Sequence, residues 1–434
     1  MKVLLLTHNP ICTGNNMGKT FLSLFSEFWR EQLCQLYIHS EIPDIDVCNS
    51  YFQITDKMVL KSLVFGTPGK EIPEEMIAER VEKRNKGEFF VPSVWKGANS
   101  LKCLARDLMW KSSRWYSSEL RAWLDRESPT VIFLAPGYAK FIYDIALKIA
   151  DERKLPIVTY VCDDYYFVKT PETYFGKKHL FLLQKKTDEL MKMTDCLVAI
   201  SEEIAQNYTS HFGVKSEVIM TGADVCASRL PIEKSEIHNF SYFGNLSLGR
   251  NISLAEIGKT IDHLNSIHGT DIVFRIYTGE NNEEVLSVFS GIRCVKFCGF
   301  VSGEAFKDTF CSSDILIHAE SFAESDIEKV KHSISTKIAD SLSSEIPLIA
   351  YGPEQISSIQ HLIRNQCAIV ATSNDMLKTA LEDAILNKDK RIFVCRNAKN
   401  VANKYHNKAK NSTMLMSVLL KAEEEYDRSP KKRT

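Results

Sequence analysis

The fold is decided by a pattern that occurs twice. It reads Val3-Leu-Leu-Leu-Thr-His-Asn-Pro-Ile-Cys-Thr-Gly-Asn-Asn-Met-Gly18 at the start of the chain and Phe240-Ser-Tyr-Phe-Gly-Asn-Leu-Ser-Leu-Gly-Arg250 beyond its middle. Each copy is a short apolar run, a polar turn that contains glycine, and then a segment with apolar residues at helical spacing. A strand, a turn and a helix in this order predict the opening unit of a Rossmann-like domain.

Short apolar runs alternate with helix-period segments on both sides of the two copies, which is typical of parallel sheets with crossover helices. Residues 40–128 are the exception, because they are rich in helical pattern and broken by prolines. We predict an α/β protein with two facing Rossmann-like domains and a cleft between them. The predicted parts are an N-terminal domain (1–225), a C-terminal domain (236–408), and a last helix that packs back toward the first domain before a basic tail (409–434).

The composition excludes several classes of protein. The chain of 434 residues carries 54 basic and 55 acidic side chains, so it has no overall field that would attract nucleic acid. No apolar run approaches the roughly 18 residues of a membrane span, and the N-terminus does not resemble a signal peptide. The cysteines form no C-x-x-C pair, which argues against a zinc site. We therefore expect a cytoplasmic protein with reduced thiols and no metal site.

The first glycine-containing turn comprises Gly14, Asn15, Asn16 and Gly18. A P-loop needs four residues between its two glycines, and only three stand here. The pattern favours instead a turn whose backbone amides meet a phosphate or a sugar at the start of a helix. The alternative is an ordinary strand-to-helix turn without a ligand.

The second turn adds a cation. Gly244 permits a close approach of the backbone to a ligand, Asn245 follows it, and Arg250 can donate two hydrogen bonds to a diphosphate. The alternative is a surface arginine at the start of a helix, where the helix dipole disfavours it.

An acid and a helix start follow the apolar run 314–318. Glu320 lies where the residues at strand ends face a ligand, and residues 324–332 are predicted to form a mobile loop. In the next helix Lys337 lies in the first turn beside a potential phosphate. Asp340, three residues later, shares its side of the helix and can accept hydrogen bonds from ribose hydroxyls.

Two further stretches allow more than one interpretation. Asp163 and Asp164 end a predicted strand, but adjacent residues of a strand point to opposite faces, so we favour a substrate-orienting role for Asp163 over a metal pair. The aromatic and basic stretch from Trp110 to Trp123 either lies on a membrane surface or forms packed helices with solvated cations, and the second interpretation is favoured.

Four stretches resemble the GT-B fold nucleotide-sugar glycosyltransferases near family four, which belong to bacterial surface-polysaccharide clusters. They are the turn that leads into Gly18-Lys-Thr-Phe21, Phe243-Gly-Asn-Leu with Arg250, Val295-Lys-Phe-Cys-Gly-Phe-Val301, and Ser335-Thr-Lys-Ile-Ala-Asp340 with the following Ile346-Pro-Leu-Ile-Ala-Tyr-Gly-Pro353. The similarity covers most of the chain and is most specific between residues 240 and 353.

This resemblance implies a hexosyltransferase. Its donor would be a nucleotide sugar such as a UDP- or GDP-sugar, used without a metal, and its acceptor a glycan or a lipid-linked oligosaccharide. The enzyme would be cytoplasmic, with a peripheral contact at the inner membrane face. Glu320 and Asp163 would serve catalysis, and the turn at Gly14, Asn15, Asn16 and Gly18 would contact acceptor or donor sugar. The residues implied for the nucleotide are Gly244, Asn245, Arg250, Phe300, Val301, Ser335, Thr336, Lys337 and Asp340.

The chain departs from the family at one place. Retaining members carry a pair of glutamates at a fixed spacing, and here His332 and Asp340 occupy those two positions. The resemblance still favours a retaining outcome. Two alternatives stay open, namely a GT-B nucleotide-sugar epimerase that uses His332 or Glu320, and a non-catalytic subunit that binds sugar or nucleotide.

Overall fold

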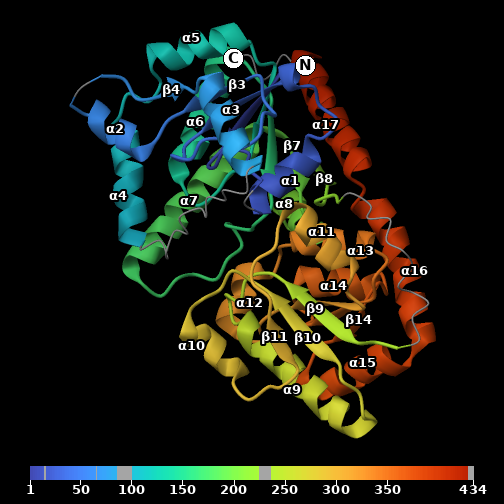
Figure 1. Ribbon diagram of the computed structural model, residues 1–434. Helices are drawn as coiled ribbons and strands as arrows, with labels where there is room; N and C mark the ends of the chain where they lie inside the picture. The colour runs from blue at the N-terminus through green and yellow to red at the C-terminus, as the bar shows by residue number, and fades with distance from the viewer. Residues whose placement is uncertain (14–15, 65, 86–99, 224–235, 429–434) are drawn as a thin grey trace. The chain divides into compact units, whose positions relative to one another are not determined.

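The computed structural model describes residues 1–13, 16–64, 66–85, 100–223 and 236–428. It divides into two compact units (Figure 1). Unit 1 comprises Met1–Thr221 together with Lys408–Thr434, and unit 2 comprises Gly222–Asn407. No helix in the described ranges is both long enough and apolar enough to cross a membrane.

Unit 1 is built on an eight-stranded sheet in which all neighbouring strands are parallel except the edge strand β4. In spatial order the strands are β4 (Lys70–Glu71), β3 (Ser50–Gln53), β2 (Leu33–Tyr37), β1 (Val3–Thr7), β5 (Val131–Leu134), β6 (Ile157–Val161), β7 (Thr194–Ala199) and β8 (Ser216–Val218). The central strands are fully buried because helices cover both faces of the sheet.

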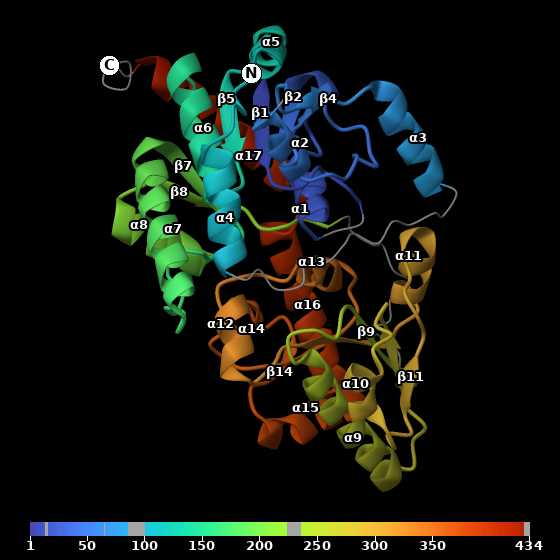
Figure 2. The same ribbon diagram turned by 90° about the vertical axis from the view of Figure 1, so that its left-hand side faces the viewer.

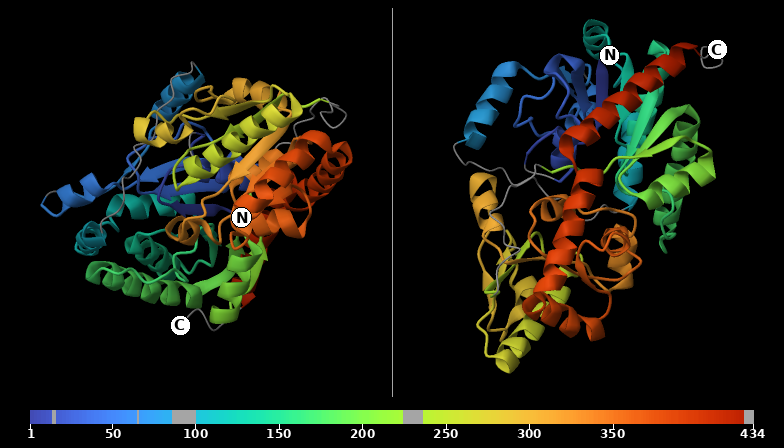
Figure 3. Two further views of the ribbon diagram at one scale, coloured as in Figure 1. Left: turned by 90° about the horizontal axis from the view of Figure 1, so that it is seen from below. Right: turned by 90° about the vertical axis from the view of Figure 1, so that its right-hand side faces the viewer.

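The helices of unit 1 are α1 (Asn16–Leu24), α2 (Asp56–Ser62), α3 (Glu74–Asn85), α4 (Ser100–Lys111), α5 (Ser118–Glu127), α6 (Lys140–Arg153), α7 (Tyr174–Met193), α8 (Glu202–Phe212) and α17 (Lys408–Arg428). The last of these comes from the end of the chain, yet it packs against α1 and against β5, β6 and β7, as the right-hand view of Figure 3 shows. Its buried Leu415, Leu419 and Ala422 recur at helical spacing and form the contacting face.

Unit 2 has a six-stranded sheet whose strands are all parallel. In spatial order they are β11 (Val295–Phe297), β10 (Val273–Tyr277), β9 (Asn239–Phe243), β12 (Ile315–Ala319), β13 (Leu348–Tyr351) and β14 (Ile369–Ala371). The helices of this unit are α9 (Arg250–His268), α10 (Glu283–Leu286), α11 (Gly303–Cys311), α12 (Glu324–Val330), α13 (Thr336–Ser343), α14 (Ser357–Arg364), α15 (Asn374–Leu386) and α16 (Lys388–Tyr405).

The sheet of unit 2 separates two cores. Alternate residues of a strand point to opposite faces, so Ile317 belongs to the core that includes α9 and α15, whereas Leu316 belongs to the core that includes α13 and α14. Strands that are apolar on both faces can only sit between two layers of helices. The predicted class, an α/β protein with two Rossmann-like domains, is confirmed.

Some local predictions need correction. The sequence pattern did not reveal β2, β3 and β4, because polar residues interrupt their apolar runs. Residues 324–332 were predicted as a loop, but Glu324–Val330 forms helix α12, whose Ile327 is buried in a core of unit 2. Trp110 and Trp123 are buried rather than presented to a membrane, which agrees with the favoured interpretation of that stretch.

Candidate functional site

The site in unit 2 lies where its strand order changes direction. The chain runs outward from β9 through β10 to β11, and then returns to place β12 on the other side of β9. The loops after β9 and β12 therefore diverge to opposite faces and leave room at the carboxyl edge of the sheet, which is where ligands bind in open α/β sheets. The predicted residues Gly244, Asn245 and Arg250 follow β9, and Glu320 follows β12.

An ion pair joins these two loops. Arg250, the first residue of α9, donates from Nε to Glu320 Oε2 over 3.0 Å, and its Nη2 lies 2.8 Å from the same oxygen. A third donor, Nη1, lies 3.3 Å from Asn245 Oδ1. The backbone carbonyl of Glu320 accepts from Ser253 Oγ over 2.8 Å, so α9 holds this loop twice. Glu320 thus orients the guanidinium group.

Glycines make the close approach of these loops feasible. Gly249, which precedes α9, has φ +66°, and a Cβ atom there would lie 2.3 Å from Ser321 Oγ. After β13, a Cβ on Gly352 would lie 3.0 Å from the Cβ of Glu320. Any larger residue at Gly249 would combine a strained backbone with a clash. Gly249 and Gly352 therefore allow the loops after β9 and β13 to approach Glu320, which follows β12.

Lys337 brings a second cation to the same place. It lies in the first turn of α13, and its Cε is 3.2 Å from where a Cβ of Gly244 would stand. Its positive charge also acts on Glu320 and His318, and this contribution favours a lower pKa for each of them. Because Gly244 has no side chain, the stem of Lys337 can pass over the turn after β9. The structure therefore brings Gly244, Arg250, Glu320 and Lys337 together, although they are far apart in the sequence.

Burial controls the protonation of the two titratable groups next to Arg250. Glu320 is only 3% exposed, and this burial raises its pKa, while the charges of Arg250 and Lys337 lower it in part. Burial, reinforced by the same two cations, lowers the pKa of His318 to about 3, so this imidazole is neutral at neutral pH. His318 Nε2 lies 3.4 Å from Glu320 Oε1.

Helix α13 carries the remaining predicted nucleotide residues. Ser335 occupies the N-cap position, and its backbone N–H donates to Ser358 Oγ over 3.0 Å. Thr336, Lys337 and Asp340 are half-buried. Ile338 and Leu342 are buried in the core beneath, as their spacing predicts, and they fix which face of the helix Lys337 and Asp340 can present.

The loop after β11 carries Phe300 and Val301. Phe300 is 69% exposed, whereas Val301 packs against a core cluster that contains Phe243. Phe243 at the end of β9 stacks on Tyr277 at the end of β10, with ring centroids 4.5 Å apart and planes 4° apart. An apolar wall therefore borders this part of the carboxyl edge, and a base could lie against it.

In unit 1 the structure describes only part of the first glycine-containing turn. Gly14 and Asn15 lie outside the described residues. Asn16 begins α1, and Gly18 is buried in its first turns, where a Cβ would lie 1.7 Å from the carbonyl oxygen of Cys12. The close approach of the backbone therefore requires a glycine at this position. Asp163 follows β6 and is half-buried, and its Oδ2 lies 3.4 Å from the hydroxyl of Tyr165.

Sequence reasoning missed the role of His318 and Ser253. His318 lies two residues before Glu320, at the end of the same strand, and this spacing could have suggested a shared direction. Ser253 gave no signal, because a serine one turn into a helix is common. In the part of the chain that the structure describes, no group of three or more His, Cys, Asp or Glu side chains could hold a metal ion.

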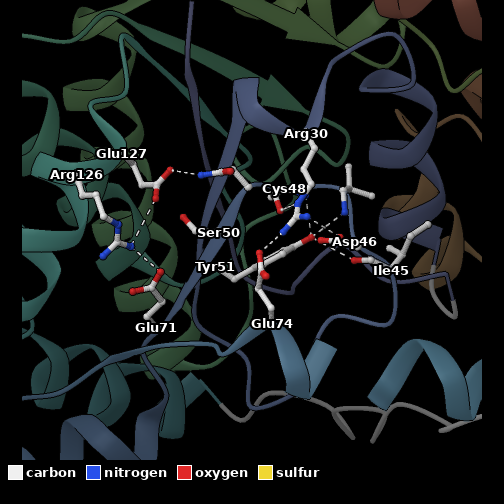
Figure 4. A network of polar contacts seen from close by, with 12 residues as sticks. Arg30, Ile45, Asp46, Cys48, Ser50, Tyr51, Glu71, Glu74, Arg126 and Glu127 are labelled. Carbon is white, nitrogen blue, oxygen red and sulfur yellow. Dashed lines mark hydrogen bonds and ion pairs between the residues drawn. The ribbon is translucent and has the colours of Figure 1, made fainter. Parts of the chain in front are cut away.

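A separate cavity of about 430 Å³ in unit 1 is lined by Arg30, Asp46, Glu74 and residues of α3. Arg30 donates from Nε to the carbonyl of Cys48, and its Nη1 and Nη2 lie 3.1 Å from Asp46 and 2.6 Å from Glu74 (Figure 4). Two carboxylates therefore neutralise the cation at this cavity, and we assign it no anionic ligand.

Known structures share the fold of this chain along nearly its whole length, at low sequence identity. A sucrose-phosphate synthase from Thermosynechococcus elongatus has a TM-score of 0.59 at 9% identity, covering 96% of this chain and 98% of that one. HepE of Anabaena, in complex with UDP and glucose, has a TM-score of 0.57 at 13% identity, covering 96% and 99%. WaaG, a glycosyltransferase involved in lipopolysaccharide biosynthesis, has a TM-score of 0.53 at 11% identity, with coverage of 96% and 99%.

The chain has the GT-B fold. No protein-family model matches the sequence, and no curated protein matches it either. The GT-B assignment therefore rests on the two Rossmann-like units and on their match to solved structures along nearly the whole chain. At these identities the comparison establishes the architecture, and the activity has to be argued from the site in unit 2.

Proposed function

We propose that this GT-B protein is a glycosyltransferase that transfers a sugar from a nucleotide-diphosphate sugar to a glycan or lipid-linked acceptor, in the synthesis of a surface polysaccharide. The observation that carries the proposal is the convergence of Arg250 and Lys337 on the glycine-lined switch point of unit 2. Two cations at the carboxyl edge of a parallel sheet suit a diphosphate. The structure of HepE with UDP and glucose supports a UDP-sugar as the first donor to test.

In this proposal each residue of unit 2 has a stated task. Arg250 and Lys337 bind the diphosphate and stabilise the charge that develops on it as the glycosidic bond to the donor breaks. Glu320 is a positioning residue, because its carboxylate holds the guanidinium through Nε and Nη2. Asp340 accepts from the ribose, and Phe300 and Val301 border the base.

Unit 1 would bind the acceptor in this proposal. Its candidate contact is Asp163 at the carboxyl edge of β6, where the carboxylate can accept a hydrogen bond from an acceptor hydroxyl. The sequence resemblance favours retention of the anomeric configuration, and the NMR signal of the anomeric proton in the product distinguishes retention from inversion.

The first test is ligand-induced thermal stabilisation. A ligand that binds only the folded state raises the apparent melting temperature. We expect one of UDP, GDP, ADP or their sugars to do so for the full chain, and we expect the shift to vanish in Lys337→Ala and Arg250→Ala. Lys378→Ala removes an exposed cation on α15 of the same unit, so it is the matched control and should keep the shift.

Turnover then separates the candidate activities. A glycosyltransferase releases nucleoside diphosphate from the donor when an acceptor extract is present. An epimerase converts the nucleotide sugar without any acceptor, and a non-catalytic subunit shows the thermal shift with neither product. The donor-site assignment is wrong if no nucleotide stabilises the protein, or if the shift survives in both site variants.

A further inference from the structure

The carboxylate of Glu320 uses its two oxygens differently. Oε2 lies 3.0 Å from Nε and 2.8 Å from Nη2 of Arg250, whereas Oε1 lies 3.4 Å from Nε2 of His318. The imidazole Nε2 is buried and has no hydrogen-bond partner among the residues that the structure describes. A buried polar atom without a partner is costly, so its place beside Oε1 needs an explanation. We call Glu320 and His318 the carboxyl–imidazole pair.

Two cations act on this pair from helices on opposite faces of the sheet. Arg250 begins α9 and Lys337 lies in the first turn of α13, and these helices belong to the cores on either side of the sheet of unit 2 (Figure 2). Burial opposes the ionised form of both members of the pair, and the two cations favour an ionised Glu320 and a neutral His318. Without a ligand, the cluster therefore holds two positive charges and one negative charge.

Other ionisable side chains around the cluster have partners of their own. The hydroxyl of Tyr242 on β9 donates to the backbone carbonyl of Asn245 over 2.7 Å, and burial raises its pKa, so it stays neutral. Asp326 on α12 lies 3.1 Å from Lys329 Nζ through its Oδ1 and accepts a hydroxyl through its Oδ2. We therefore expect a proton that enters the cluster to be held by the carboxyl–imidazole pair.

A nucleotide sugar would reverse the sign of the charge in this cluster. This step rests on the proposed function, in which Arg250 and Lys337 bind the diphosphate. The diphosphate brings two negative charges, so with an ionised Glu320 the net charge would change from positive to negative. Glu320 is only 3% exposed, so water cannot screen its carboxylate from the phosphates. A proton on the carboxyl group removes this repulsion and leaves two cations with two anionic phosphate groups.

We propose that binding of a nucleotide sugar to unit 2 takes up one proton from the solvent, and that this proton lies in a hydrogen bond from Glu320 Oε1 to His318 Nε2. The neutral carboxyl group still accepts from Arg250 through Oε2, so the guanidinium group keeps its position. Nε2 gains the partner that it lacks once the two atoms approach by roughly half an ångström, to ordinary hydrogen-bond length. Glu320 thus accepts the proton, and His318 is a positioning residue for the protonated form.

The test counts protons by isothermal titration calorimetry of the full chain with UDP-glucose, GDP-mannose and ADP-glucose. The phosphates of these diesters do not titrate near neutral pH, so any proton taken up binds to the protein. The apparent binding enthalpy is measured in MOPS, HEPES and Tris buffers, and its slope against the ionisation enthalpy of the buffer gives the number of protons. We expect uptake of about one proton, and an affinity that falls up to about tenfold as the pH rises from about 7 to about 8, because the bound state holds the additional proton.

Variants of the pair locate the proton. Glu320→Gln resembles the protonated carboxyl group in shape and charge, so it should bind the nucleotide sugar without proton uptake and with an affinity that does not depend on pH. His318→Phe removes the hydrogen-bond acceptor and should lower the uptake, whereas His318→Gln, whose amide carbonyl can accept, should retain most of it. Glu256→Gln changes a half-buried acid elsewhere on α9 and should behave as the wild type.

The outcomes separate this inference from the proposed function. Binding of a nucleotide sugar by the wild type without proton uptake overturns the inference and leaves the donor site in place. Uptake that persists in Glu320→Gln overturns it as well. If none of the three nucleotide sugars binds, both the donor-site assignment and this inference are wrong. Melting temperatures verify that the variants are folded, and the wild-type measurement decides the question even if one of them is not.

Discussion

Six neighbouring strands of unit 1, β3-β2-β1-β5-β6-β7, follow the same order as the six strands of unit 2. The two units differ in the side chains that lie where this order changes direction. In unit 1 the strands β1 and β5 flank this point, and His8 after β1 contacts Arg106, which in turn pairs with Asp56. In unit 2 the strands β9 and β12 flank it, and Arg250 pairs with Glu320. Both positions thus carry an ion pair at the same place in the topology, but the acid is 41% exposed in unit 1 and only 4% exposed in unit 2.

The difference lies in which elements supply the partners. In unit 1, helices α2 and α4, inserted between β3 and β5, bring Asp56, Asp107 and Arg106, so each cation meets its own acid. In unit 2, Arg250 and Lys337 both act on Glu320. The comparison shows that the strand order determines where a site lies. The ratio of cations to acids at that place determines whether the site can bind an anion.

The largest effect is expected from an added methyl group in the opening turn of unit 1. In unit 1, Gly18→Ala would place a Cβ 1.7 Å from the carbonyl oxygen of Cys12, and a backbone atom cannot move aside cheaply. We expect a loss of about 3 kcal/mol or more in the free energy of unfolding, measured by urea denaturation. Gly137→Ala, with no atom within 4 Å, is the control and should change stability little. A stable Gly18→Ala protein would show that this turn has room to adapt.

Breaking the ion pair of unit 2 tests the other switch point. Arg250→Ala leaves the buried carboxyl of Glu320 without its nearest cation, and we expect a loss of about 3 kcal/mol near pH 8. The folded-state pKa of Glu320 is already raised by burial and rises further in this variant, so the folded state binds its proton more tightly than the unfolded state. The loss should therefore shrink as the pH falls toward 5.

The double variant Arg250→Ala with Glu320→Gln is the control for this pH dependence. It removes the titrating carboxyl, so its deficit relative to wild type should be smaller and should not depend on Glu320 ionisation. If the single variant lost the same free energy at pH 5 and pH 8, the carboxyl of Glu320 would not be the group that Arg250 stabilises.

A smaller effect is expected at the two histidines that lie next to these ion pairs, His8 in unit 1 and His318 in unit 2. Burial lowers the pKa of His8 in unit 1 to about 4 and that of His318 in unit 2 to about 3. Both imidazoles stay neutral in the folded state, so the stability they confer is complete above about pH 6.5 and is lost as the pH falls toward these values. NMR titration should show a higher pKa for His318 alone in Arg250→Ala, and for His8 alone in Arg106→Ala. A shift of both histidines in either variant would show that the two units are coupled.

The smallest effect is expected at the exposed ion pair of Arg30. Glu74 is 76% exposed, so its attraction to Arg30 is screened by solvent although the two atoms are 2.6 Å apart (Figure 4). We expect Glu74→Ala to change the free energy of unfolding by less than about 0.5 kcal/mol. A loss comparable to that of Arg250→Ala would mean that burial is not what distinguishes the two arginines.

Sequence reasoning went furthest where one local pattern determines one element. The doubled opening pattern forms β1 with α1 and β9 with α9, each a strand, a turn and a helix in the predicted order. Sequence reasoning failed for β2, where Gln35 interrupts the apolar run. The side chain of Gln35 is buried, because its amide donates to Thr7 Oγ1 and its carbonyl accepts from the N–H of Ile11. A polar residue satisfied by tertiary contacts looks like a loop residue in the sequence.

The sequence by itself determined the α/β class, the doubled opening pattern and the residue types gathered after the strands, because apolar periodicity and glycine act over a few neighbouring residues. Only the tertiary structure decided that Arg250 pairs with Glu320, seventy positions away, that Lys337 passes over Gly244, and that residues 324–330 form a helix. These outcomes depend on strand order and on burial. Strand order sets which loops meet, and burial sets which charges must find partners.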